Sequence, residues 1–334
     1  MQLKNFGTQI SEYSGQPAAV PESWHAALTQ LNSLLDREQH CVVVFDEFQW
    51  MANYRSEVVS ELKLFWDRYW SKLKSRMVLV LCGSIASFMI KGVVRSKALY
   101  GRTDTVIHLQ PLMLSEIREF LPQLGIEELF LTMFVFGGVP KYLELIKNEP
   151  SIILAIQKLA YTADSYFQHE YERIFVSHFG AKRQYQEIVR LLAAHHAGLT
   201  RIQISKLTGY SPGGRLSDKL FDLESAGFIR SYAPFNRKLG GAYTRYILSD
   251  PYLRFYFAFI EPNLEKSRNQ KDVFRGIAQS SAFQSWLGFA FEHWCLDHRA
   301  LLASILEFAA VDYTAGPYWG RRQDKSFQID LILD

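Results

Sequence analysis

Two carboxylates directly follow a short apolar run in the first part of the chain. The run is Cys41-Val42-Val43-Val44-Phe45, and Asp46 and Glu47 come next. A continuous apolar run of this length predicts a strand that is buried on both faces, as in a parallel sheet. The carboxylates would then lie at the C-terminal edge of that strand, where open α/β sheets bind their ligands.

These two carboxylates suit the hydrolysis of a nucleoside triphosphate. Asp46 would bind Mg²⁺ directly or through water, because Mg²⁺ prefers hard oxygen ligands and keeps several waters. Glu47 would hold a water molecule in line with a γ-phosphate. This is the chemistry of a Walker B motif followed by a catalytic glutamate. A buried strand that ends in a solvated acidic turn has the same residues, so both interpretations stay open at this point.

Two further strands are expected downstream, after a long helix over residues 55–75. The run Met77–Cys82 ends in Gly83-Ser84, and Thr105–Leu109 follows Arg102. Alternating strands and helices favour a parallel sheet. Ser84 would be a sensor that hydrogen-bonds the attacking water or the γ-phosphate, or else a turn serine. Arg102 would reach phosphate oxygens, or else be a surface arginine.

Composition limits the class of protein. The 334 residues suggest two or three domains, and 48% hydrophobic and 14% aromatic residues suffice for a large core. The net charge of +3 is too small to indicate nucleic-acid binding by itself. The three cysteines lie far apart, without metal or disulfide spacing, which favours a reducing compartment. No signal peptide and no apolar run of membrane-spanning length is present, so we expect a cytoplasmic protein without a membrane partner.

Four segments in a fixed order carry a resemblance to a known family. They are Val-Val-Val-Phe-Asp-Glu-Phe-Gln-Trp (42–50), Leu-Val-Leu-Cys-Gly-Ser (79–84), Leu-Tyr-Gly-Arg (99–102) and Phe-Gly-Gly-Val-Pro-Lys-Tyr-Leu (136–143). The set resembles the archaeal-type AAA+ (P-loop) ATPases that carry a C-terminal nuclease-like domain. The resemblance covers nearly the whole chain. It implies Asp46 for Mg²⁺, Glu47 for water activation, Ser84 as sensor and Arg102 near the phosphates of ATP.

One part of the family pattern is absent from the sequence. The family grips phosphate with a Walker A loop, G-x-x-x-x-G-K-[S/T], and this sequence contains no Gly-Lys dipeptide. The family's first two strands are also missing, and Met1 falls just after the second. We therefore expect ATP hydrolysis to be negligible. Strands 41–45 and 77–82 should pair in parallel, and strand 105–109 should be left without its usual partner or move over to pair with 77–82.

Residues 184–249 show a winged-helix pattern of three helices and a β-hairpin. The third helix carries Arg215 and Lys219, and the turn of the hairpin is Asn236-Arg237-Lys238-Leu239-Gly240-Gly241. If this unit binds DNA, Arg215 and Lys219 would face the major groove, and Arg237 and Lys238 would lie on the wing. Acidic residues share the third helix, however, so a unit for intramolecular or protein contacts remains an equal alternative.

The last part of the chain contains an aromatic helix and two nuclease-like motifs. The aromatic helix over 250–262 is expected to be core. A glutamate on a helix, Glu292, and an aspartate that leads an apolar strand, Asp330, resemble the first two motifs of PD-(D/E)xK nucleases. The resemblance implies that both belong to a metal site. The third motif, E-x-K, would come after Asp334.

The predicted fold class is α/β, with four successive parts. These are a partial parallel-sheet P-loop ATPase core (1–135), a helical lid (136–180), a winged-helix domain (181–250) and a partial α/β nuclease-like domain (251–334). The predicted function is that of an ATP-binding ATPase. A DNA-binding or regulatory protein and a metal-dependent DNA nuclease remain alternatives. ATP and Mg²⁺ are implied by the resemblance, and DNA and a second copy of the chain are the open partners.

Overall fold

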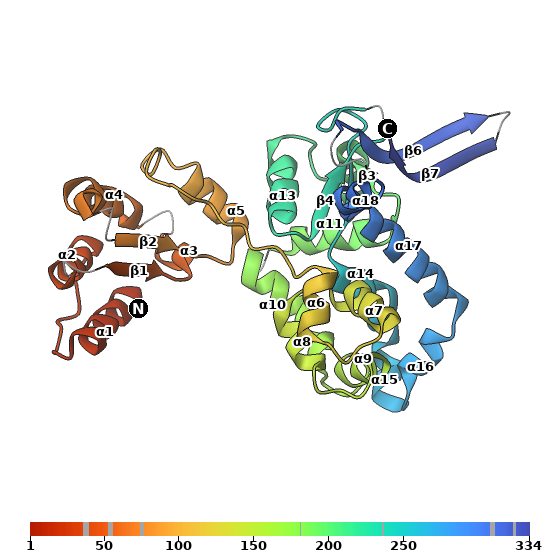
Figure 1. The fold of residues 1–334 in the computed structure, drawn as a ribbon, viewed down its shortest axis with the longest axis horizontal. Helices are drawn as coiled ribbons and strands as arrows, with labels where there is room; N and C mark the ends of the chain where they lie inside the picture. Colours follow the sequence, from red (N-terminus) through yellow and green to blue (C-terminus); the bar gives the residue numbers. More distant parts are fainter. Residues whose placement is uncertain are drawn as a thin grey trace. The chain divides into compact units, whose positions relative to one another are not determined.

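The chain forms two compact units, Met1–His108 and Leu109–Asp334, and each is described by itself (Figure 1). The computed structural model describes residues 1–35, 40–52, 56–73, 77–180, 182–235, 237–307, 311–322 and 325–334. Residues 55, 74 and 75 of the predicted long helix and Asn236 of the predicted wing lie outside the described residues.

The first unit is built around two parallel strands. β1 (Cys41–Phe45) pairs with β2 (Met77–Leu81) in a register that runs from Cys41 opposite Met77 to Phe45 opposite Leu81. The predicted parallel pairing is therefore confirmed. The helices and helical turns of this unit are α1 (Gln2–Ser14), α2 (Trp24–Leu34), α3 (Phe48–Met51), α4 (Val58–Arg68), η1 (Trp70–Leu73), α5 (Ala86–Phe88) and η2 (Met89–Val94).

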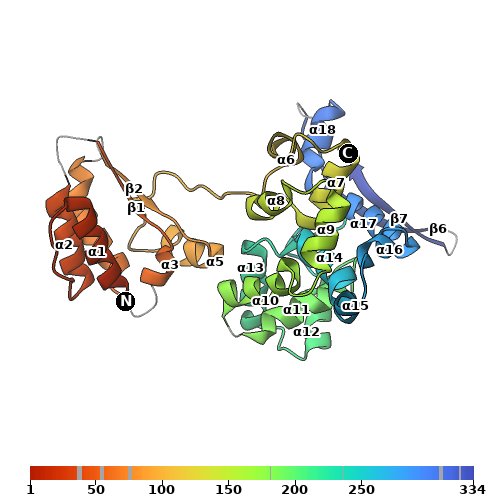
Figure 2. The ribbon, with the colours of Figure 1, turned by 90° about the horizontal axis from the view of Figure 1, so that it is seen from below.

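One face of the β1–β2 pair carries the core of this unit. Phe45 and Met77 are buried with Leu28 of α2 and with Leu62 and Phe65 of α4. Figure 2 shows α1 and α2 (red) beside one side of the two strands. Burial of apolar surface against these helices is the main stabilising term for the pair.

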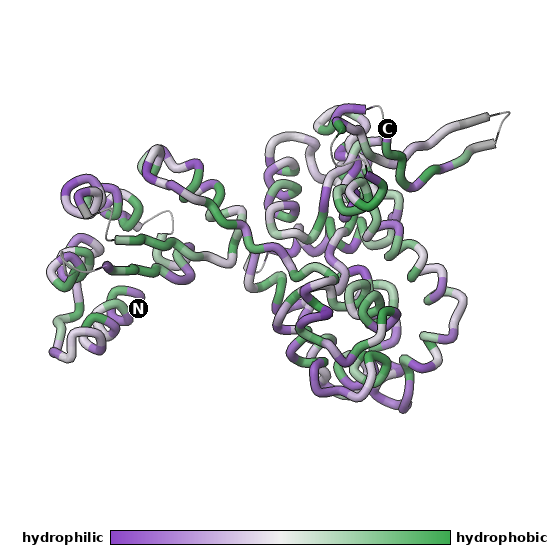
Figure 3. Tube along the Cα trace, in the orientation of Figure 1, coloured by the Kyte–Doolittle hydropathy of each residue, from purple (hydrophilic) through white to green (hydrophobic). Residues whose placement is uncertain are grey.

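The other face of the strand pair is exposed, so the prediction of strands buried on both faces is wrong. Val42 and Val44 are 67% and 57% exposed, and their neighbours Val78 and Val80 are 56% and 37% exposed. Side chains alternate between the two faces of a strand, and no helix within the described residues covers this one. Figure 3 shows β1 and β2 in the green of hydrophobic residues. The sequence pattern could not distinguish a covered from a bare apolar face.

The predicted third strand is also wrong. Residues 102–113 form neither helix nor strand, and Val106, Ile107 and Leu109 are exposed. A strand requires a neighbour for its N–H and C=O groups, and none of the described residues pairs with this segment. Of the two predicted outcomes, the segment is left without a partner and does not move over to β2.

The second unit is mostly helical. Its helices are α6 (Leu114–Phe120), α7 (Ile126–Phe136), α8 (Pro140–Ile146), α9 (Ile152–Ala160), α10 (Tyr166–Phe179), α11 (Arg183–Ala193), α12 (Arg201–Thr208), α13 (Gly214–Ser225), α14 (Pro251–Phe255), the π-helix η3 (Tyr256–Ile260), the 3₁₀ turn η4 (Glu261–Asn263), α15 (Leu264–Asn269), α16 (Val273–Ala278), α17 (Ser281–Asp297) and α18 (Arg299–Ile305). The many helices follow from apolar residues at helical spacing with polar caps, such as Ser151 before α9, whose side chain accepts the Leu154 N–H.

A single hydrophobic cluster runs through this unit from Ile117 to Ala290. The predicted core role of the aromatic segment 250–262 is confirmed, because Tyr252, Phe255 and Phe259 are buried there. The predicted lid, winged-helix and nuclease-like segments thus share one continuous core. The boundaries proposed between those segments stay predictions.

Two antiparallel sheets complete the second unit. β3 (Leu199–Thr200), β5 (Arg245–Leu248) and β4 (Ile229–Tyr232) form one in that spatial order. The long strands β6 (Ala315–Arg322) and β7 (Lys325–Leu333) pair as a two-stranded ribbon (Figure 1). Within the described parts of the chain, no helix is long and apolar enough to cross a bilayer.

The bare face of β1–β2 leads to a first prediction. Val42→Thr should change the free energy of unfolding by less than about 0.5 kcal/mol, because the side chain already faces water. Val58→Thr on α4, where the side chain is 0% exposed, should cost about 1–3 kcal/mol for burying a hydroxyl. Urea unfolding of the two matched variants measures both values. A loss at Val42 equal to that at Val58 would mean that the face is covered.

Candidate functional site

The ends of β1 and β2 are joined by backbone hydrogen bonds beyond the strands themselves. The Cys82 N–H donates to the Phe45 carbonyl at 2.9 Å, and the Phe48 N–H donates to the Cys82 carbonyl at 2.8 Å. These bonds hold the turn after β1 against the turn after β2. The residues predicted to carry chemistry at the two strand ends are therefore neighbours in space.

Glu47 and Ser84 are in direct contact, with Gln49 as a third member. The Ser84 hydroxyl donates to Glu47 Oε2 at 2.9 Å. The Gln49 Nε2 donates to Ser84 Oγ at 3.0 Å and also to Glu47 Oε2. Since one carboxylate oxygen accepts two bonds, the orientation of Glu47 is set and its Oε1 is left for another donor. Ser84 therefore positions Glu47.

The backbone of Glu47 adopts a conformation that non-glycine residues rarely adopt. Its φ is 50°, in the left-handed region, and its N–H donates to Asp46 Oδ1 at 2.9 Å. Such a conformation costs about 1–3 kcal/mol and is concentrated at functional sites. Here it lets the chain turn sharply after β1, so that both carboxylates stay at the strand edge.

Gly83 is required by the close approach of Gln49. A Cβ at Gly83 would lie 2.5 Å from Gln49 Oε1 and 2.7 Å from Met89 Sδ. Gln49 itself is 7% exposed, and its Oε1 has no hydrogen-bond partner among the described residues. The turn after β2 thus leaves room for a buried amide whose main role is to hold Glu47 and Ser84.

The site has the oxygen donors that Mg²⁺ prefers, but few of them. Asp46 is exposed, its Oδ1 accepts the Glu47 N–H at 2.9 Å, and its carboxylate also bonds to the Cys82 thiol. Desolvation, and then the neighbouring Asp46 carboxyl, raise the pKa of the Cys82 thiol. In the described part of the chain, no three His, Cys, Asp or Glu side chains group as a metal site. Mg²⁺ held by Asp46 would keep most of its waters.

Arg102 does not lie with these residues. Its Nε and Nη2 donate to the two carboxylate oxygens of Asp67 on α4 at 2.7 and 2.8 Å. Its Nη1 donates to the carbonyls of Ala98 and Tyr100. In this structure the guanidinium is engaged in a bidentate pair, and a role near phosphates would require that pair to open.

Gly83→Ala should disturb the site through packing. Because its Cβ overlaps Gln49 and Met89, we expect a loss of about 1–3 kcal/mol in unfolding free energy. Gly276→Ala on α16 is the matched control, since nothing lies within 4 Å of its Cβ, and it should stabilise by up to about 1 kcal/mol. Chemical denaturation measures both. Equal stability of Gly83→Ala and the parent chain would contradict the close packing.

The residues predicted to contact DNA lie at the surface of the second unit. Arg215 and Lys219 are on α13, and the Lys219 Nζ lies 3.5 Å from the Arg215 carbonyl oxygen. Arg237 and Lys238 are exposed in the loop between β4 and β5, where Arg237 lies over the Tyr243 ring at 4.6 Å. The three helices and the paired strands expected over 184–249 are present.

Two of the three acidic residues on α13 serve internal bonds. Asp222 accepts the Tyr185 hydroxyl at 2.7 Å, and Glu224 accepts the Ser231 N–H at 2.6 Å. Asp218 is exposed. Asp222 and Glu224 thus have packing roles. A hydrogen bond from a hydroxyl or an N–H does not remove the charge of a carboxylate, so the alternative of protein contacts stays open.

If α13 contacts DNA phosphates, the salt dependence of binding should report it. Arg215→Ala and Lys219→Ala should each lower the slope of log K against log salt by about one. Lys158→Ala is the control, because Lys158 is already paired with Glu149 on another part of the unit. Fluorescence anisotropy with a DNA duplex measures the slopes. A slope unchanged by both variants would remove α13 as a DNA contact.

Glu292 and Asp330 line one small pocket of about 40 Å³. Glu292 lies on α17 and Asp330 within β7. Burial, and then the charge of Asp330, raise the pKa of the Glu292 carboxyl. The Asp330 Oδ1 accepts the Gln328 Nε2 at 2.7 Å. The two carboxyl groups are thus close, as expected, and their role in a metal site stays a prediction.

Two residues of the candidate sites, Gln49 and Arg254, were given no functional role from the sequence. Gln49 follows the carboxylates on the turn after β1, and its position beside them was the available signal. Arg254 lies in the aromatic segment Asp-Pro-Tyr-Leu-Arg-Phe-Tyr-Phe, all of which was assigned to the core. A lone charge inside an aromatic helix was the signal there.

Comparisons with known proteins agree with the fold. No family model matches the chain. An uncharacterised protein of Methanocaldococcus jannaschii is 26% identical over 331 residues, which are 99% of this chain and 71% of the relative. A solved Walker-type ATPase of Pyrococcus abyssi is similar with a TM-score of 0.50 and 18% identity, over 70% of this chain and 68% of that chain. The chain therefore has a mixed, mostly helical α/β fold that resembles a P-loop ATPase.

Proposed function

We propose that the unit Met1–His108 carries the carboxylate half of an ATP-hydrolysis site. The observation that carries this proposal is the contact of Glu47 with Ser84 and Gln49 at the C-terminal edge of parallel strands. The likeness in fold to a Walker-type ATPase supports it. The resemblance of the four sequence segments to archaeal-type AAA+ ATPases points to the same chemistry.

Each residue has a distinct part in this proposal. Asp46 would hold Mg²⁺, which when bound neutralises phosphate charge. Glu47 would hold the attacking water, with its carboxylate kept in place by Ser84 and Gln49. Orientation before nucleotide arrives is what makes such groups effective, because no free energy is then lost in ordering them during the reaction.

The same residues do not fit the triphosphate by themselves. Phosphate binding of this class depends on backbone N–H groups of a glycine-rich loop and on its lysine, and the sequence contains no Gly-Lys dipeptide. Arg102 is held by Asp67.

We therefore expect negligible ATP turnover by this chain. Robust turnover that Glu47→Gln abolishes would contradict this expectation.

A cation titration tests the proposal directly. Mn²⁺, used as a paramagnetic probe for Mg²⁺, should bind saturably to the intact chain, and Asp46→Asn should abolish that binding. Asp67→Asn is the matched control, because Asp67 is paired with Arg102. Electron paramagnetic resonance measures free Mn²⁺ during the titration. Equal Mn²⁺ binding by the parent chain and Asp46→Asn would remove Asp46 from the site.

A second function, DNA contact, is proposed for residues 181–250 in a winged-helix arrangement. The observation that favours it is the exposure of Arg215, Arg237 and Lys238, while Asp222 and Glu224 are engaged internally. Contact with another protein remains the competing interpretation. The salt slopes described above separate the two, because protein contacts through other residues would not depend on Arg215 and Lys219.

A further inference from the structure

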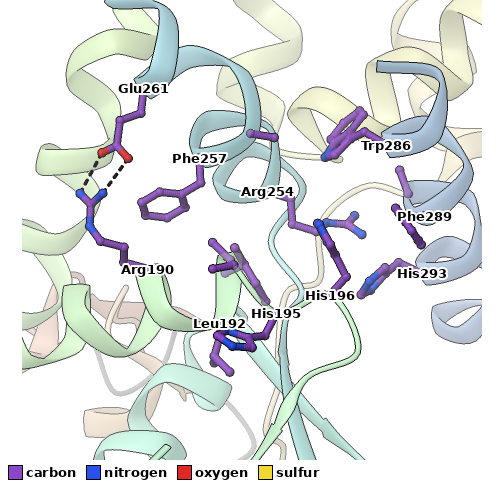
Figure 4. Close-up of a pocket in the computed structure, with 15 residues that line it drawn as sticks. Arg190, Leu192, His195, His196, Arg254, Phe257, Glu261, Trp286, Phe289 and His293 are labelled. Atoms are coloured by element: carbon purple, nitrogen blue, oxygen red, sulfur yellow. Dashed lines mark hydrogen bonds and ion pairs between the residues drawn. The ribbon is translucent and has the colours of Figure 1, made fainter. Parts of the chain in front are cut away.

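A pocket of about 260 Å³ in the second unit has no part in the functions considered so far. Its walls come from α11 and the residues after it, from the segment α14–η3, and from α17. Arg254 and Arg190 contribute charge, and the aromatic walls are Phe257, Trp286 and Phe289. Apolar walls with a few convergent polar groups are typical of small-molecule sites. Figure 4 shows Arg190 and Glu261 at one end and Arg254 with Phe289, His196 and His293 at the other.

Arg254 lines this pocket with two guanidinium nitrogen atoms that have no hydrogen-bond partner among the described residues. Its Nε and Nη1 are shielded from solvent, and neither bonds to any of the described residues. Burial lowers the pKa of Arg254 to about 10, so it stays charged at neutral pH. Asp250 attracts Arg254 through space, but the Asp250 Oδ1 accepts the Leu253 N–H at 2.7 Å. Asp250 therefore balances the charge of the guanidinium, but the Nε and Nη1 of Arg254 form no hydrogen bond with the described residues.

The two neighbouring arginines each form an ion pair with a carboxylate. Arg190 forms a bidentate pair with Glu261, at 2.6 and 2.8 Å. Arg230, which is close enough to repel Arg254, pairs with Asp297. A guanidinium that is desolvated and lacks partners is costly, because its N–H groups lose their bonds to water. Arg230 also keeps its Nε without a partner among the described residues, but its Nη1 is paired with Asp297. At Arg254 neither Nε nor Nη1 is bonded, and Arg254 lines the pocket.

The surroundings of Arg254 add a flat apolar surface and a neutral ring. His196 stacks on Phe289 with ring centroids 5.0 Å apart and planes 7° from parallel. Partial burial, and then the charge of Arg254, lower the pKa of His196, so its ring is neutral at physiological pH and does not add to the positive charge. Trp286 and Phe257 are further aromatic walls. The pocket thus pairs one fixed positive charge with surfaces that suit a planar group.

We propose that this pocket binds a small molecule with an oxyanion on a flat apolar body, with Arg254 as the anion's partner. Guanidinium is the side chain best matched to phosphate and carboxylate groups. The aromatic walls would hold the body of the ligand, and the volume allows only a small one. This inference concerns the second unit alone, so it does not depend on the ATP site.

Calorimetry with phenyl phosphate, benzoate and inorganic phosphate tests the proposal on the full chain. We expect saturable one-to-one binding of phenyl phosphate or benzoate, and the tighter of the two identifies the anion. Inorganic phosphate should bind at least tenfold more weakly, because it lacks the apolar body. No saturable binding of either aromatic anion would overturn the proposal, and so would inorganic phosphate binding as tightly as phenyl phosphate.

Variants of two arginines give the decisive comparison. Arg254→Met should weaken binding at least tenfold, and Arg254→Lys should weaken it less, because the charge is kept without the fork. Arg173→Met is the control and should bind within a factor of two of the parent chain, because Arg173 lies on α10 over the Tyr166 ring and does not line the pocket. Equal binding by Arg254→Met and the parent chain would overturn the proposal.

Thermal unfolding guards against a trivial loss of structure. Without ligand, Arg254→Met should still unfold in a single cooperative transition, although at a lower temperature than the parent chain, because the buried Asp250 carboxyl loses its neighbouring opposite charge. Phenyl phosphate should raise the melting temperature of the parent chain and of Arg173→Met, and leave that of Arg254→Met unchanged. An equal rise in all three would show that the anion binds elsewhere.

Discussion

The parallel pairing of β1 with β2 is the constraint on which the candidate site depends. Parallel strands end at the same edge, and here two backbone bonds through Cys82 continue the pairing beyond the strands. The turn after β1 therefore meets the turn after β2. Glu47 and Ser84 are 37 positions apart in the sequence. Without that alignment they would also be far apart in space. Everything proposed about nucleotide chemistry follows from this one pairing and from the side chains at its edge.

Both units keep polar groups at a cost where function is proposed. Glu47 adopts a left-handed backbone, and Gln49 buries an amide oxygen without a partner among the described residues. Arg254 is desolvated beside the aromatic cluster of the second unit. Each feature lowers the stability of the fold. Each also lies beside a surface where a bound cation or anion would offset that loss. The apolar packing of α2 and α4 on β1–β2, and the aromatic cluster of the second unit, supply the stability that offsets these costs.

The sequence predicts short-range structure well, and long-range context poorly. Apolar runs located β1 and β2, and helical spacing located the helices of the second unit, because both patterns are local. The run over 105–109 looked equally strand-like, but a strand also requires a neighbour, which no local pattern reveals. The same limit explains the bare face at Val42 and Val44. At the candidate site, the local pattern placed Asp46, Glu47 and Ser84 at neighbouring strand ends. It gave no sign of the pairing of Arg102 with Asp67, because Asp67 lies on another element.

The hydroxyl of Ser84 holds Glu47 in place before any nucleotide is present. A double-mutant cycle with Glu47→Ala and Ser84→Ala measures this directly, through the unfolding free energies of the parent chain, both single variants and the double variant. Residues in direct contact couple by about 0.5–3 kcal/mol, and the 2.9 Å bond between them predicts a value in that range. Strictly additive effects of the two substitutions would contradict the account.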